Sequence, residues 1–543
     1  MIATLEDLWY EGHMSTNVVN LDALIPREDF TVEDRTSTGR LVETINILSL
    51  AGDFFGPDLR KPDFQRETAH WTPAKVVDLL RAFVDMDLIP AVILWRSGRY
   101  IFVVDGAHRL SAILAWIQDD YGDRRKSLDY FGGFITDEQR KVADKTRALV
   151  NKEIGSYQEY LAARSNPDGA PDKLKKRLSN LSVSNIIAQW VPATDASSAE
   201  ASFFKINQAA TPIDPTERRL LRARHSASAI AARAITHAGT GHKYWSQFKD
   251  KDTITNIEET GKKIYKLLYN PPIGGSPVTT LDVPVAGRGY NTLPFVFDLV
   301  NYSNNITVAD TTTRKDITDT LPADTDGSLT ITYLYNVLKR IHRLTGDTSV
   351  SLGIHPVVYF YTRSGTFQPI AFLAASKFFE RLAEKELLMK FSSVRAAFED
   401  FLIEHKEAIS LLVHKFGTGS RSIPWLMKYY ESVMDGFLKE KTSEEIQHEF
   451  SKNPDFAFLT VPRPTGIHET SKKDGKRVFS SNTKTATYFA SALPGCVRCK
   501  ICNARIHRNS MHIDHITRVR DSGTADMTNA QVVHPYCDST IKG

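Results

Sequence analysis

Residues 495–543 read GCVRCKICNARIHRNSMHIDHITRVRDSGTADMTNAQVVHPYCDSTIKG and contain all four cysteines of the 543-residue chain. Two pairs of ligand residues in this stretch have the spacing that tetrahedral zinc uses. Cys499 and Cys502 form the first pair, and His534 and Cys537 form the second. Three thiolates and one imidazole predict a structural zinc site, which can fold a module of about 50 residues that buries little core by itself.

The fourth cysteine, Cys496, leaves the register of this zinc site open, because it also forms a Cys-x-x-Cys pair with Cys499. We prefer the pair Cys499 and Cys502, since a site built on Cys496 would displace Cys502. Four clustered cysteines are too few for a disulfide framework. In a reducing compartment they indicate metal binding.

A second set of residues in the same stretch is suited to the hydrolysis of phosphodiesters. Asp514 and Asp538 offer hard oxygen ligands of the kind that Mg²⁺ or a similar divalent ion prefers. Imidazole is the side chain that titrates near neutrality, so His515 is suited to accept a proton from an attacking water. A divalent ion would stabilise the charge on the phosphorane oxygens and on the leaving 3′ oxygen.

With these residues in place, the stretch resembles the HNH, or ββα-metal, endonuclease family. The resemblance implies that Asp514 and Asp538 hold the catalytic metal and that His515 is the general base. It also implies that Asn529 orients the loop between the two strands. Asp538 stands where the family more often has His or Asn, and a carboxylate is a competent ligand. The alternative is a zinc ribbon that binds without cutting, which needs neither the Asp-His pair nor the later asparagine.

The basic charge of the chain is concentrated around this stretch. Residues 461–543 contain 13 lysines and arginines against 6 aspartates and glutamates, a net charge of +7, whereas the first 460 residues carry −3. Attraction to the phosphates of DNA favours such a distribution. No apolar run is long enough to span a bilayer, and the start of the chain lacks the pattern of a signal peptide. We therefore expect a cytoplasmic protein without a membrane partner.

Local patterns nearer the N-terminus predict a helix followed by a hairpin. Thr72 can cap a helix over residues 72–84, and Pro73 suits its first position. The apolar runs 91–95 and 100–104 then flank a turn-prone segment and predict two buried, paired strands.

A polar loop, Asp105–Arg109, joins the second of these strands to another predicted helix. The free N–H groups and the dipole of a helix N-terminus favour anions such as phosphate, and Arg109 adds a positive charge. The alternative is a capped turn in which Asp105 serves only as the N-terminal cap.

This region resembles the ParB/sulfiredoxin-like domain of GmrSD-type modification-dependent restriction enzymes and of SspE-like phage-defence proteins. The residues that carry the resemblance are Lys61-Pro62-Asp63-Phe64-Gln65-Arg66, Trp71, Ile89-Pro90, Val104-Asp105-Gly106-Ala107-His108-Arg109-Leu110 and Phe204-Lys205-Ile206-Asn207. The family's loop usually reads Asp-Gly-Gln-Gln-Arg and is associated with nucleotide binding and hydrolysis, whereas this chain has Asp-Gly-Ala-His-Arg.

The resemblance implies a nucleotide site, and with it an NTP as a ligand and an NTPase activity as a further function of this domain. The residues implied in nucleotide binding are Gln65, Arg66, Asp105, Gly106, His108 and Arg109.

The fold class predicted for the whole chain is multidomain α+β. Residues 1–220 are expected to form the ParB/sulfiredoxin-like sensing domain, and residues 221–460 a mainly helical middle. Residues 461–490, rich in Lys, Ser, Thr and Gly, are expected to be a linker, and residues 491–543 a small zinc-stapled ββα-metal domain. Residues 165–180 are expected to form a surface loop.

The leading hypothesis is a defence nuclease in which a nucleotide- or DNA-sensing domain controls an HNH domain that cuts phage or modified DNA, as a monomer or a homo-oligomer. Two alternatives stay open. One is a ParB-like, nucleotide-switched DNA-binding protein with an inactive HNH unit, and the intact HNH residues argue against it. The other is an HNH toxin or mobile-element nuclease with an unrelated sensor, and the blocks Phe64-Gln65-Arg66 and Asp105–Arg109 argue against it.

Overall fold

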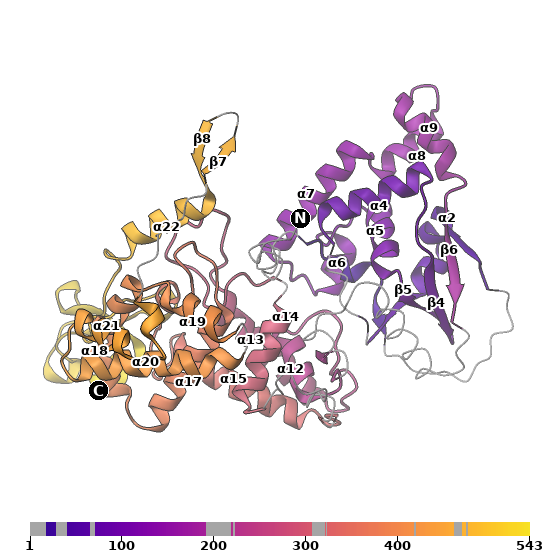
Figure 1. Ribbon diagram of the computed structural model, residues 1–543. Coiled ribbons are helices and arrows are strands. Elements are labelled where there is room, and N and C mark those ends of the chain that lie inside the picture. The colour runs from indigo at the N-terminus through magenta and orange to yellow at the C-terminus, as the bar shows by residue number, and fades with distance from the viewer. Residues whose placement is uncertain are drawn as a thin grey trace. The chain divides into compact units, whose positions relative to one another are not determined.

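The computed structural model describes residues 18–28, 41–63, 65, 71–191, 219–220, 223–290, 292–306, 321, 323–417, 420–460, 470–473 and 476–542 (Figure 1). The chain divides into two compact units. Unit 1 comprises Met1–Glu259, Tyr290–Phe297 and Thr307–Ile331. Unit 2 comprises Thr260–Gly289, Asp298–Ile306 and Thr332–Gly543.

Unit 1 is built on a six-stranded mixed sheet in the order β1-β3-β5-β4-β6-β2. Its strands are β1 (Arg27–Glu28), β2 (Thr44–Asn46), β3 (Leu59–Pro62), β4 (Val92–Ser97), β5 (Tyr100–Asp105) and β6 (Asn185–Trp190). The antiparallel pair β4 and β5 is the predicted hairpin, and it turns at Gly98. β3 runs parallel to β1 and β5, β6 runs parallel to β4, and β2 closes the edge antiparallel to β6.

Helices α4 and α5 lie beside this sheet (Figure 1) and share its apolar core. The described helices of this region are α2 (Ile47–Ala51), α3 (Phe55–Asp58), α4 (Pro73–Asp85), α5 (Ala107–Gln118), α6 (Arg125–Tyr130), α7 (Asp137–Glu153), α8 (Tyr157–Ser165), α9 (Asp172–Leu181) and α12 (Ala227–Thr236). α4 begins as predicted, because the side chain of Thr72 accepts a hydrogen bond from the amide of Lys75. Its apolar face, which includes Val76, Leu80 and Phe83, is buried.

The expectation of a surface loop over residues 165–180 is wrong in its second half, where α9 begins at Asp172. Most residues of this segment are polar, so the few apolar residues on one face of the helix do not stand out in the sequence. Leu174 and Leu178 pack against the core of unit 1. Arg177 fixes the helix further, because its Nε lies 2.8 Å from Oδ1 of Asp85 at the end of α4.

The middle of the chain is mainly helical, as predicted. Its described helices are α13 (Lys251–Tyr269), α14 (Leu293–Ser303), α15 (Ser328–Leu344), α16 (Pro356–Tyr359), α17 (Pro369–Glu384), α18 (Leu388–Glu404), α19 (Ala408–Phe416), α20 (Ile423–Leu438) and α21 (Ser443–Lys452). Stacked and tilted aromatic rings of α17, α18 and α20 form much of the core of unit 2, among them Phe378, Phe398 and Tyr430. None of the helices in the described part of the chain is both long and apolar enough to cross a membrane.

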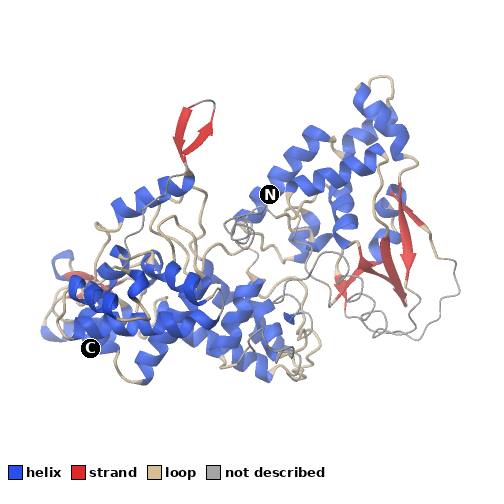
Figure 2. Cartoon of the chain, in the orientation of Figure 1, coloured by secondary structure: helices blue, strands red, loops and turns tan. Residues whose placement is uncertain are grey.

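The predicted linker, residues 461–490, has regular structure over nearly all of its described residues. It contains the hairpin of β7 (Thr470–Lys473) and β8 (Lys476–Phe479), drawn in red in Figure 2, and most of helix α22 (Ser481–Ala492). α22 is anchored by two residues one turn apart, Thr485 and Phe489, which are both buried. The amide of Val278 donates to Oγ1 of Thr485 over 2.9 Å. Two anchors in a polar helix are too few for the periodicity to stand out in the sequence.

The C-terminal stretch folds within unit 2 around two short strands, β9 (His512–His515) and β10 (Ala530–Val533), followed by a π-helical turn, Cys537–Ile541. The strands pair antiparallel, with His515 opposite Ala530 and Asp514 opposite Gln531. The apolar cluster of this module is small, and two of its four buried members are Cys499 and Cys537. A core of that size is typical of modules that a metal ion stabilises.

Candidate nuclease and metal centre

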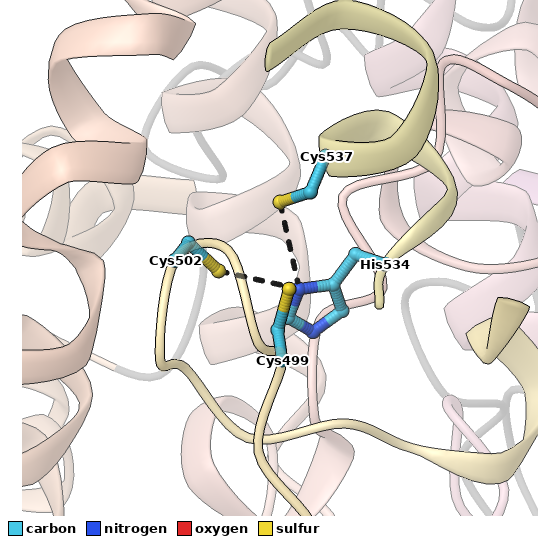
Figure 3. A group of neighbouring side chains, drawn as sticks. All are labelled: Cys499, Cys502, His534 and Cys537. Carbon is cyan, nitrogen blue, oxygen red and sulfur yellow. Dashed lines mark hydrogen bonds between the residues drawn. The ribbon is translucent and has the colours of Figure 1, made fainter. Parts of the chain in front are cut away.

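The four predicted zinc ligands, Cys499, Cys502, His534 and Cys537, converge in unit 2 (Figure 3). Their ligand atoms all lie within 4.8 Å of one another. Nδ1 of His534 lies 3.4 Å from Sγ of Cys502 and 3.8 Å from Sγ of Cys537. Cys496 lies outside this group, so the structure assembles the register built on Cys499 and Cys502.

The imidazole of His534 is oriented for metal binding. Its Nε2 donates a hydrogen bond of 3.0 Å to the carbonyl oxygen of Arg505, which leaves the Nδ1 lone pair facing the thiols. Burial lowers the pKa of His534, and the positive charge of Arg395 lowers it further, so the ring is neutral. Hydrogen bonds from the thiols of Cys502 and Cys537 lower the pKa of the Cys499 thiol. Three sulfurs and one neutral imidazole fit a tetrahedral zinc ion.

Asp514 lies on β9, and its carboxylate is held by two donors from the same module. Oδ2 accepts from Nζ of Lys542 over 2.6 Å and from Nε2 of Gln531, its cross-strand neighbour, over 2.9 Å. Burial acts to raise the pKa of Asp514, but the hydrogen bonds from Lys542 and Gln531 outweigh it and lower the pKa. The carboxylate is therefore ionised, and it already contacts a cation. Lys542 also donates to the backbone oxygen of His515.

Asp538 lies on the π-helical turn and contacts a residue that the sequence reasoning missed. Its Oδ2 is 3.3 Å from Nδ1 of His512, whose Nε2 lies 3.1 Å from the carbonyl oxygen of Asp347. Side chains two positions apart on a strand share a face, so His512 lies on the same face of β9 as Asp514. The signal that could have found it is this two-residue spacing before Asp514.

Asn529 is buried, and it closes the loop that follows β9. Its Oδ1 accepts from the amide of Thr517 over 2.7 Å, and its Nδ2 donates to the carbonyl oxygens of Thr517 and Thr524. His515, just before this loop, is half-buried. Among the described residues none hydrogen-bonds to its imidazole ring, which leaves the ring available to a substrate.

The two carboxylates fit a divalent ion by their chemistry, because both are hard oxygen donors and the one at Asp514 already pairs with an ammonium group. In the structure they make separate contacts. Asp514 binds Lys542 and Gln531, while Asp538 contacts His512. Within the described ranges, the cysteine and histidine group alone brings three or more metal-ligating side chains within 4.8 Å.

The loop at the start of α5 is shaped by Gly106. It is the N-terminal cap of the helix, at φ +96°, and a Cβ there would lie 2.5 Å from Cγ1 of Val92. The alternative role of Asp105 as the cap is wrong, since no side chain caps α5. Instead Oδ2 of Asp105 lies 2.7 Å from Nη2 of Arg109, which also donates to the carbonyl oxygen of Ala91 over 3.0 Å.

The other residues predicted at this site gather at the same end of β5. The ring of His108 stacks on Trp71, with centroids 5.5 Å apart. Nε2 of Gln65 donates to the carbonyl oxygen of Val104 over 3.4 Å, and its buried Oε1 has no hydrogen-bond partner among the described residues. Arg66 and the segment 204–207 lie outside the described residues.

Comparison with known families finds two matches on this chain. Residues 47–226 match the family model of the GmrSD restriction endonuclease, N-terminal domain, and residues 499–542 match that of the HNH endonuclease. The predicted combination of these two domains is confirmed. The second match spans the cysteine and histidine group together with the HNH residues. No curated protein and no solved structure matches the chain.

Proposed function

We propose that this chain, which joins a GmrSD-type N-terminal domain to an HNH endonuclease domain, is a metal-dependent DNA endonuclease of the restriction or phage-defence type. The observation that carries the proposal is the arrangement of the HNH residues. Asp514 and His515 end β9, and Asn529 holds the loop behind them. Asp538 follows from the next turn. A zinc ribbon that only binds DNA would not need these residues.

In the proposed reaction, the half-buried imidazole of His515 takes the proton of the attacking water. Asp514 and Asp538 would hold a divalent ion, which when bound supplies positive charge to the phosphate and to the leaving oxygen. Lys542 contacts both the Asp514 carboxylate and the backbone oxygen of His515, so it holds this carboxylate against the end of β9. Asn529 keeps the loop after His515 in place through three hydrogen bonds.

The cysteine and histidine centre is proposed to be a structural zinc site. It joins the segment before β9 to the segment after β10, since two ligands come from each side. A zinc ion there would hold together a module whose apolar cluster has only four buried residues.

The GmrSD-type domain is proposed to decide when and where the DNA is cut. HNH contacts are mainly to phosphates, which position a protein on DNA without specifying sequence. Selection of phage or modified DNA therefore has to come from the rest of the chain. The loop Asp105–Arg109, at the N-terminus of α5, is the best-placed candidate for binding a nucleotide.

The test is cleavage of matched modified and unmodified phage DNAs by the full-length protein, with Mg²⁺ and with or without each NTP. We expect cleavage that depends on the divalent ion, on the modification state of the DNA and on the nucleotide. Failure to cut any of these DNAs, by protein shown to be folded and zinc-loaded, would overturn the proposed activity.

A further inference from the structure

Hydrogen bonds connect the cysteine and histidine centre to helix α18, which precedes the first ligand, Cys499, by about a hundred residues in the chain. Glu399 of α18 is fully buried, and its Oε2 accepts from the amide of Arg505 over 2.9 Å. The carbonyl oxygen of the same Arg505 accepts from Nε2 of His534 over 3.0 Å. One peptide segment thus connects a helix carboxylate to the imidazole ligand.

A second connection runs through Arg395, one turn before Glu399 on α18. Its Nε lies 2.8 Å from Oε1 of Glu399, and Nη2 donates to the carbonyl oxygen of Gly353 over 3.0 Å. Nη1 donates to the carbonyl oxygen of Leu352. Gly353 packs directly on the metal ligand, because a Cβ at this position would lie 2.7 Å from Cδ2 of His534. The imidazole is therefore fixed through both its Nε2 and its ring edge.

The charge expected at the metal centre is opposite to that of the neighbouring Arg395. Three thiolates and one divalent ion carry a net charge of −1, which would be costly to bury without a cation nearby. Arg395 is buried and provides that cation. Burial by itself would lower the pKa of Arg395, but the pKa is raised, and the negative charge of Glu399 is the largest cause that raises it. The guanidinium is thus permanently charged beside the metal ligands.

We infer that Glu399 and Arg395 are positioning residues for the metal centre and that the nuclease module holds its zinc tightly only while it packs on α18. The inference rests on the proposed zinc site. Partners that orient a ligating histidine fix its tautomer and raise its basicity, and their loss typically weakens metal binding by about 10- to 100-fold. The described hydrogen bonds of Arg395 and Glu399 reach none of the HNH residues, so the effect on catalysis is expected to act through the metal centre.

The test uses the full-length double variant Arg395→Met/Glu399→Leu. Replacing both members of a buried ion pair by apolar residues of similar volume removes the two opposite charges together and often preserves stability, while it also takes away the cation beside the zinc centre. We expect the dissociation constant for zinc, measured by competition with a chromophoric chelator, to rise at least about 10-fold. The matched control is Arg340→Met/Glu380→Leu, which removes an ion pair between α15 and α17 with a shortest distance of 2.5 Å. Zinc affinity should be unchanged in the control.

If the double variant does not fold, the single variant Glu399→Gln tests whether zinc affinity depends on Glu399. It keeps the size of the side chain but loses the charge that pairs with Arg395, so we expect a smaller rise in the dissociation constant. The visible spectrum of the Co²⁺-substituted protein should also change, because His534 loses its fixed orientation. Wild-type zinc affinity and an unchanged Co²⁺ spectrum in folded variants would overturn the inference. Absence of bound zinc from the wild-type protein would instead overturn the zinc proposal itself.

Discussion

Gly106 shows how one residue determines the shape of a candidate binding loop. Its φ of +96° is strained for any residue with a Cβ, and the added atom would also lie 2.5 Å from Cγ1 of Val92. We predict that Gly106→Ala lowers the free energy of unfolding of unit 1 by about 1–3 kcal/mol, measured by urea denaturation. The control is Gly133→Ala, at φ +81° with no atom within 4 Å of the added Cβ. Equal losses in the two variants would contradict the steric part of this account.

A buried histidine in unit 2 predicts sensitivity to acid. Burial holds the pKa of His355 well below 6.5, and the neighbouring positive charges of Arg505 and Arg395 add to the effect. The unfolded chain therefore binds more protons than the folded chain below about pH 6.5, and stability falls as the pH falls through that value. His355→Leu removes this proton uptake. We predict that thermal unfolding between about pH 6.5 and 5 is less steeply pH-dependent in the variant. The same pH dependence of thermal unfolding in the wild-type protein and in His355→Leu would contradict the assignment of His355 as an acid-sensitive residue.

The residues at the metal centre were predictable only where spacing along the chain encodes them. The positions of Cys499 and Cys502, and of His534 and Cys537, are close enough in sequence to reveal a four-ligand set. Glu399 could not be found in this way. Its role depends on the packing of α18 against the C-terminal module, and no local pattern records that contact.

At the scale of elements, the helix α4, the hairpin of β4 and β5, and the start of α5 follow from local signals. Each has a clear apolar face or a cap, as at Thr72. Helices α9 and α22 were not predicted, because they are polar helices held by a few buried residues and by partners far along the chain. Their stability comes from tertiary contacts, which short-range patterns do not show.

The pairing of β9 and β10 is predicted to depend on the metal centre. Cys537→Ser removes one ligand, and because zinc binding and folding are coupled in small modules, zinc should be lost and β9 and β10 should unfold. Elemental analysis and limited proteolysis of the region 491–543 would measure both effects. Cys496→Ser is the control, since Cys496 lies outside the group of ligands. A zinc-free Cys537→Ser protein with an intact, protease-resistant module would show that the strands do not need the metal.

For the whole molecule, the proposal requires that the N-terminal domain control the nuclease. A nucleotide can do so only if it binds the active and inactive arrangements of the chain with different affinity. We predict that Arg109→Ala, which breaks the contact with Asp105, abolishes nucleotide binding and also changes the rate or the substrate choice of cleavage. Arg125→Ala, at a highly exposed arginine, is the control. Lost nucleotide binding with unaltered cleavage would mean that the two domains act independently.

The central claim is that the HNH domain cuts DNA with His515 as its general base, and the most direct test is cleavage by His515→Ala. The variant should keep its zinc and its fold, because among the described residues none hydrogen-bonds to the imidazole ring. We predict that, with Mg²⁺ and a DNA that the wild-type protein cuts, the rate falls at least about 100-fold. Chelation of the divalent ion should abolish wild-type cleavage. Cleavage by His515→Ala at the wild-type rate would contradict the account.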